Sequence, residues 1–172
     1  MRRMRVIQLT QGKVANVDAE DYDRLNQYNW AAKKCANNWY AQRLVYLPRP
    51  DGKKGAHTSI MMHQEVLGHR GRVDHRDMNG LNNRKGNLRK STRSQNLANA
   101  RKRVHASSRY KGVSWDNEAQ KWRSRITVSG KTIALGRFED EKEAAAVYDT
   151  AARRYFGEFA RTNLDLNITG SN

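Results

Sequence analysis

Strand-like alternation of apolar and polar residues is clearest in the last third of the chain. Three segments rich in β-branched and aromatic residues, separated by turn residues, predict strands over 110–115, 122–128 and 131–138. Side chains alternate between the two faces of a strand. One face of the middle strand carries Trp122, Ser124, Ile126 and Val128, and the other carries Arg123, Arg125 and Thr127. The pattern predicts a sheet with a core face and a cationic face.

A helix is predicted directly after these strands, over residues 141–156. Its apolar positions recur at helical spacing, at Ala144, Val147, Tyr148, Ala151 and Tyr155. Acidic residues near its start and basic residues near its end complement the helix dipole, and Gly157 can end it. The four segments predict a compact β-β-β-α module over 108–165, followed by a flexible tail over 166–172.

The first 70 residues show shorter elements. Residues 5–47 predict several strands and one small helix, which Asp18 opens and which carries Tyr22, Leu25 and Tyr28 on one face. Asp18 and Asp21 have the spacing of a capping box. Residues 48–55 are turn-forming, and residues 59–67 suggest a buried helix start.

The most informative stretch covers residues 73–99, which predict a β-hairpin followed by a helix. A short strand ends at Asp74 and His75, and a polar loop rich in asparagine and glycine leads to a second strand at 88–90. Ser94 can cap the helix that carries Asn96. Asn87 can bind backbone groups through its amide and so tie the two strands together.

These residue types suit phosphodiester hydrolysis. The reaction needs an activated water, charge stabilisation on the phosphoryl oxygens and support for the leaving 3′ oxygen. Asp74 and Asn96 offer the oxygen ligands that magnesium prefers, and His75 can act as the general base. Two readings stay open for Asn82, Asn83 and Arg84: contact with the scissile phosphate, or shaping of the turn.

The composition of the chain indicates the kind of molecule that it binds. The 172 residues include 33 Lys and Arg against 17 Asp and Glu, a formal charge of +16. Between Arg70 and Lys111 stand 13 basic and 2 acidic residues, which favours a polyanion as the partner, although a ribosomal-type or solvated surface is the simpler reading of a basic run. The basic, non-periodic segment 101–107 predicts a linker between a domain over 1–100, with its ββα core at about 59–100, and the module over 108–165.

Two kinds of site and two locations are disfavoured by composition. A single cysteine, Cys35, excludes an internal disulfide and cysteine-rich zinc sites. No stretch of about 18 apolar residues is present, and the first residues lack the features of a signal peptide. We therefore predict a cytoplasmic protein with no membrane partner.

Segments over residues 5–100 resemble HNH homing endonucleases of phages. They are IQLTQGKVANVDAEDY (7–22), MHQEVLG (62–68), VDH (73–75), LNNRKGNLR (81–89) and SQNLAN (94–99). The resemblance implies an α+β protein whose N-terminal unit is a ββα-metal (HNH, His-Me finger) nuclease. It makes His75 the base and Asn87 the middle asparagine, and it places Asn96 where other members have histidine, as in the branch that binds one metal through Asp and Asn. His63 resembles a Met-His pair of that family, for which we expect a packing role.

Residues 108–164 resemble the DNA-binding domain of plant ethylene-response factors, a three-stranded antiparallel sheet with a packed helix. The motifs are SRYKGVSW, KWRSRI and LGRFEDEKEAAAVYDTAARRYFGEFARTNL. In that family the exposed face of the sheet lies in the major groove of DNA. The resemblance implies DNA contacts from Lys111, Trp115, Arg123, Arg125 and Lys131, although a core position is favoured for Trp122. The chain departs from the plant pattern at Ser114, Arg125, Thr127 and Ala134, so no target sequence carries over.

Together these features predict a metal-dependent endonuclease that acts on double-stranded DNA. We expect one divalent cation, magnesium or alternatively manganese, no small-molecule substrate, a monomer, and action in a bacterial or phage-infected cell. One alternative is a transcriptional regulator whose nuclease site is degenerate. A second is an RNA-binding accessory of the ribosome, which two distinct modules make a poorer fit.

Overall fold

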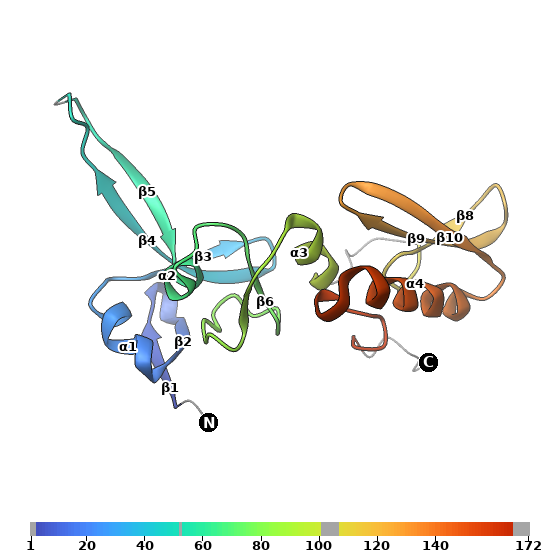
Figure 1. The fold of residues 1–172 in the computed structure, drawn as a ribbon, viewed down its shortest axis with the longest axis horizontal. Helices are drawn as coiled ribbons and strands as arrows, with labels where there is room; N and C mark the ends of the chain where they lie inside the picture. Colours follow the sequence, from blue (N-terminus) through green and yellow to red (C-terminus); the bar gives the residue numbers. More distant parts are fainter. Residues whose placement is uncertain (1–2, 52, 101–106, 167–172) are drawn as a thin grey trace. The chain divides into compact units, whose positions relative to one another are not determined.

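The computed structural model describes residues 3–51, 53–100 and 107–166. The chain divides into two compact units, Met1–Ser91 and Thr92–Asn172 (Figure 1). This boundary lies before the helix of residues 93–99, whereas the sequence predicts a boundary near residue 100. The predicted linker lies mostly outside the described residues, as does most of the predicted tail. None of the helices in the described parts of the chain is long and apolar enough to cross a membrane.

The first unit combines small antiparallel sheets with two short helices, in an α+β arrangement. Its sheets are β1–β2, β3–β4–β5 and β6–β7. The elements are β1 (Met4–Gln8), η1 (Thr10–Gly12), β2 (Val14–Asp18), α1 (Ala19–Asn26), β3 (Ala31–Cys35), β4 (Asn38–Leu47), β5 (Ala56–Met61), α2 (Met62–Leu67), β6 (Val73–His75) and β7 (Leu88–Lys90). The long β4–β5 hairpin extends away from the rest of this unit (Figure 1).

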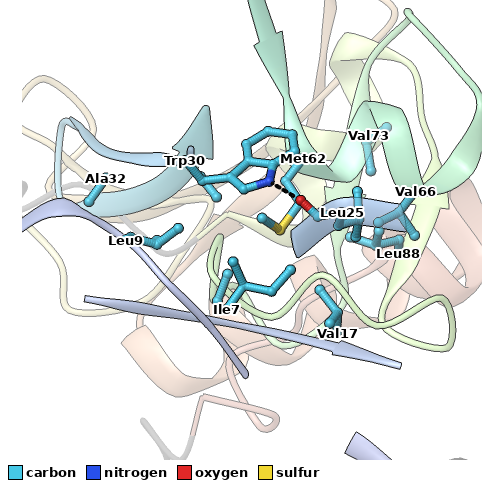
Figure 2. Close-up of a cluster of buried hydrophobic side chains, with 12 residues drawn as sticks. Ile7, Leu9, Val17, Leu25, Trp30, Ala32, Met62, Val66, Val73 and Leu88 are labelled. Carbon is cyan, nitrogen blue, oxygen red and sulfur yellow. Dashed lines mark hydrogen bonds between the residues drawn. The ribbon is translucent and has the colours of Figure 1, made fainter. Parts of the chain in front are cut away.

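One hydrophobic core holds the first unit together. Figure 2 shows Ile7, Val17, Leu25, Met62 and Leu88, which come from β1, β2, α1, α2 and β7 and pack in one cluster. Burying each such side chain stabilises a fold by about 1.5–3 kcal/mol. Trp30 joins the cluster, and its indole N–H donates a hydrogen bond to the carbonyl of Leu25 at 2.8 Å. The hairpin β6–β7 is thus anchored to a core that residues from the start of the chain help to build.

The second unit contains one three-stranded antiparallel sheet, in the order β10–β9–β8, and two helices. Its elements are α3 (Arg93–Asn99), β8 (Val113–Asp116), β9 (Lys121–Val128), β10 (Lys131–Phe138), α4 (Glu141–Phe156) and η2 (Gly157–Phe159). The predicted helix over 141–156 and the strands over 122–128 and 131–138 are confirmed, whereas the first predicted strand, over 110–115, begins only at Val113 because residues 110–112 form a turn. Asp140 caps α4 by accepting a hydrogen bond from Glu143 N at 2.8 Å, and Gly157 ends it with φ 51°.

The core of the second unit lies between the sheet and α4. Ile126 of β9 packs against Tyr148 and Phe156 of α4, and Ala98 of α3 belongs to the same cluster. The alternation predicted for β9 is confirmed, because Ser124 and Ile126 are buried while Arg125 and Thr127 are exposed. One residue of the predicted stripe on α4 was placed wrongly: Tyr155 is exposed, and the buried ring at the end of the helix is Phe156.

Candidate functional site

The hairpin β6–β7 places Asp74 and His75 side by side at the end of a strand. Asp74 lies directly opposite Arg89, and His75 lies opposite Leu88. Nε of Arg89 donates to Oδ2 of Asp74 at 2.7 Å, and Nη2 lies 2.7 Å from the same oxygen in an ion pair. The side chains of Arg89 and Asp74 are only 8% and 3% exposed. Arg89 is a partner that sequence reasoning missed, although an arginine opposite an aspartate in a two-stranded pairing is a detectable signal.

His75 is buried, and its ring contacts two other rings. Its centroid lies 5.1 Å from that of His63 on α2 and 5.8 Å from that of Tyr40 on β4. Burial lowers the pKa of His75, against the opposing effects of the Asn83 amide and of the carboxylates of Asp77 and Asp74. The buried environment therefore favours the neutral imidazole, which is the form that can accept a proton.

The loop between β6 and β7 is held by Asn87, as the sequence predicts. Its Oδ1 accepts from the backbone N–H of Asp77 at 3.1 Å, and its Nδ2 donates to the carbonyl of Asn82 at 2.8 Å. Nδ2 also donates to Oδ1 of Asp77 at 2.9 Å. One amide thus closes the loop that begins directly after His75.

Asn82 and Asn83 make contacts that shape this loop. Asn82 donates from Nδ2 to Oδ2 of Asp77 at 2.7 Å. Asn83 is 1% exposed, and its backbone N–H donates to the carbonyl of Asn16 at 2.8 Å. These bonds correspond to the turn-shaping alternative that the sequence left open. Contact of either residue with a phosphate stays a prediction.

Asp18, the last residue of β2, anchors the loop between β6 and β7, and sequence reasoning missed this role. Its Oδ1 accepts from Nε of Arg84 at 3.0 Å, and its Oδ2 accepts from the backbone N–H of Lys85 at 2.9 Å. The predicted capping box with Asp21 is wrong, since Asp18 makes no side-chain hydrogen bond to cap α1. The side chain of Arg84 is therefore already paired with a carboxylate, which makes it a weaker candidate for a phosphate.

The side chain of Lys85 adds further ion pairs to this anchor. Its Nζ lies 2.9 Å from Glu20 and 3.1 Å from Asp21. The three carboxylates of Asp18, Glu20 and Asp21 lie close enough together to suggest a metal. Arg84 and Lys85 neutralise most of the charge of these carboxylates. We therefore interpret the cluster as an ion-paired anchor of the loop.

Asn96, the second predicted metal ligand, lies on α3 in the second unit. The helix starts with a capping box in which Thr92 Oγ1 accepts from Gln95 N at 3.2 Å and Gln95 Oε1 accepts from Thr92 N at 2.8 Å. The predicted cap at Ser94 is thus wrong: Ser94 lies inside the helix, and its hydroxyl accepts from the backbone N–H of Ser129 at 3.1 Å. A cation shared by Asp74 and Asn96 stays a prediction. Carboxylate and amide oxygens are the donor chemistry that magnesium takes.

The sheet of the second unit presents cationic side chains on its exposed face. Arg125 is exposed and Arg123 is half-buried, and both lie on this face; Lys131 is exposed but pairs with Val128, which lies on the opposite face. Trp115 contacts Trp122 with ring centroids 4.9 Å apart, and Trp122 packs against the core, as the sequence favours.

Lys111, in contrast, faces the interior of this unit. Its ammonium donates to the carbonyls of Ala98 and, at 2.9 Å, of Ala100, at the end of α3. Burial lowers the pKa of Lys111 to about 8. These bonds give Lys111 a helix-capping role that disfavours the DNA contact implied by its position in the sequence.

The fold is thus of the mixed α+β class with small antiparallel sheets, an architecture compatible with a nuclease or an AP2-like DNA-binding fold. No family model matches the chain. It is similar to an uncharacterized HNH endonuclease of Acanthamoeba polyphaga mimivirus, with 37% identity over 53% of this chain and 46% of that protein. It is also similar to an AP2-like ethylene-responsive transcription factor of Arabidopsis thaliana, with 34% identity over 46% of this chain and 15% of that protein.

A third relative is protein 3.8 of Escherichia phage T7, which is 35% identical over 52% of this chain and 73% of its own length. The chain belongs to the same family as this phage protein. It spans less than half the length of the mimivirus protein and about a seventh of the plant factor.

Proposed function

We propose that the chain is a metal-dependent DNA endonuclease of the HNH type, which hydrolyses phosphodiester bonds in double-stranded DNA. The observation that carries the proposal is the pair Asp74 and His75 on a buried two-stranded hairpin, with the imidazole kept neutral by burial. The similarity to an HNH endonuclease supports it. The net charge of +16 suits a polyanionic substrate.

In this proposal Asp74 and Asn96 hold one divalent cation, magnesium or manganese. Their oxygen atoms fit such an ion, and Arg89 keeps the Asp74 carboxylate in one orientation through a hydrogen bond and an ion pair. When bound, the ion would polarise the scissile phosphate and support the leaving 3′ oxygen. The pairing of Asp74 and Asn96 rests on the resemblance and on the chemistry of the donors.

His75 acts as the general base in the proposed mechanism. A neutral imidazole takes one proton from the attacking water, and the resulting hydroxide attacks the phosphorus. Asn87 and Asn83 hold the loop around the imidazole, so that its direction does not depend on the substrate. The products carry 5′-phosphate and 3′-hydroxyl ends.

The second unit would supply DNA affinity in this proposal. Its candidates are Arg123 and Arg125 on the cationic face of the sheet, the exposed Lys131 at the start of β10, and Trp115, which lies on the same face as Trp122. The similarity to an AP2-like transcription factor supports a DNA-binding role for the chain. The same observation favours a second candidate function, a DNA-binding regulator without nuclease activity.

Supercoiled plasmid DNA with magnesium separates the two functions. We expect the wild-type protein to nick or linearise the plasmid, and His75→Ala to bind DNA comparably without cutting it. His57→Ala is the matched control, because His57 is an exposed histidine that contacts Tyr46 on the β4–β5 hairpin. Circular dichroism of each variant shows whether the fold is kept.

Each result points to one conclusion. Equal cutting by the wild-type protein and by His75→Ala would contradict the role of His75. DNA binding without cutting by the wild-type protein would favour the regulator.

A further inference from the structure

A buried histidine that the proposed mechanism does not use lies against the candidate base. His63, the second residue of α2, is 8% exposed. Its ring meets that of His75 edge-on, with an angle of 90° between the planes and 5.1 Å between the centroids. Tyr40 closes the group, with its ring centroid 5.9 Å from that of His63 and 5.8 Å from that of His75.

The three rings come from three different elements, and the surrounding chain holds them in place. His63 follows Met62, a fully buried residue of the core. Gly80 passes so close to Tyr40 that a Cβ at residue 80 would collide with the tyrosine ring. Gly80 therefore closes off one side of the tyrosine ring, which lies edge-on against both imidazoles.

A histidine at position 63 is energetically unfavourable if its role is packing alone. Among the residues that the structure describes, none makes a hydrogen bond to its Nδ1, which is fully buried. Buried polar atoms are nearly always paired, and those that are not tend to occur at functional sites. Burial, with a smaller contribution from His75, lowers the pKa of His63 to about 4, so that the ring is neutral. A phenylalanine would fill the same space without an unsatisfied nitrogen.

We infer that His63 is a positioning residue for His75, whose polar ring edge fixes the direction of the neighbouring imidazole. The inference rests on the proposed function, in which His75 must face the attacking water. A general base works only within hydrogen-bond reach of the proton that it takes, and a displacement of about 1 Å can lower a rate on the order of 100-fold. His63 thus acts on the reaction through His75 and does not touch the substrate.

The test replaces His63 by phenylalanine in the full-length protein, which keeps a ring of similar size and removes both nitrogens. We expect the urea midpoint of His63→Phe to equal or exceed that of the wild type, because an unsatisfied polar atom is removed. In plasmid nicking with magnesium we expect kcat to fall about tenfold, as for the loss of one useful polar contact, with KM within about twofold. His57→Phe, which makes the same exchange in the exposed pair with Tyr46, should change neither quantity.

Opposite changes in stability and kcat are the signature of this role. Wild-type kcat in His63→Phe would overturn the inference and leave His63 a packing residue. A lower urea midpoint with a fall in kcat and a rise in KM would also overturn it, because the residue would then be structural. Absence of nicking by the wild-type protein would overturn the proposed function itself, and this inference with it.

Discussion

Replacing Arg89 by methionine tests whether Asp74 depends on its buried partner. Methionine keeps most of the side-chain volume and removes both the hydrogen bond and the ion-pair contact to Oδ2 of Asp74, each of 2.7 Å. Removing one partner of a buried ion pair costs about 3–5 kcal/mol, since the remaining charge stays in a poorly solvated place. At an m-value of about 2 kcal/mol/M, this loss lowers the urea midpoint of the first unit by about 2 M.

A second arginine–aspartate pair provides the control. Nη2 of Arg49 lies 2.8 Å from Oδ2 of Asp51, a distance similar to that of the buried pair, but the two side chains are 56% and 43% exposed. Arg49→Met should therefore cost less than about 0.5 kcal/mol, because water screens an exposed pair. Hydrogen exchange of peptides from the first unit, followed through urea unfolding, measures both variants without a contribution from the second unit.

The double variant Asp74→Ala with Arg89→Met completes the experiment. Its loss should be smaller than the sum of the two single losses by more than about 1.5 kcal/mol, because neither charge is then left in the interior without the other. Equal losses in Arg89→Met and Arg49→Met, or simple additivity in the double variant, would refute the reasoning from burial.

Two further predictions concern the second unit. Gly112 has φ 80°, and a Cβ there would collide with the ring of Tyr148. Gly112→Ala should therefore lower the free energy of unfolding, measured by urea titration, by at least about 2 kcal/mol. Gly130 has φ 83° with open space around it, so the control Gly130→Ala should show only the cost of the backbone strain. Because the pKa of Lys111 falls from 10.5 to about 8 on folding, the unfolded chain binds more protons between these values, and stability should rise with pH above 8. Urea midpoints from pH 8 to 9, below the ordinary pKa of tyrosine, should rise in the wild type and less in Lys111→Met; equal slopes would contradict the lowered pKa of Lys111.

Local signals in the sequence were sufficient for α4 and for most of the three-stranded sheet of the second unit. The helix over 141–156 has acidic residues at its start, a capping Asp140 and a terminating Gly157, and each signal acts within one turn of the backbone. The strands follow from alternation in the same way. Tyr155 was misplaced because apolar spacings of three and four residues both fit a helical stripe, so the pattern allows either Tyr155 or Phe156 to be the buried ring at the helix end. Tertiary packing selects Phe156.

Interactions between distant residues could not be read in this way. Lys111 has the position of a DNA contact in the resemblance, yet its ammonium ends at carbonyls of α3 more than ten residues away. Asp18 has the sequence context of a helix cap and instead binds Arg84, 66 residues further along the chain. In both cases a local motif and a tertiary partner compete for one side chain, and only the folded chain decides between them.

The loop after His75 explains why the resemblance to HNH nucleases reaches back to residue 7. Asn16 of β2 bonds to backbone groups of Leu81 and Asn83, at 2.9 and 2.8 Å. Asn38 of β4 donates from Nδ2 to the carbonyl of Met78 at 2.8 Å.

With Asp18, these residues hold the loop from two strands, β2 and β4, that lie far from it in sequence. A loop of polar residues has little apolar surface of its own to bury, and order must come from such outside bonds. The first 40 residues therefore serve the candidate site as its scaffold, and changes there should move His75 without touching it.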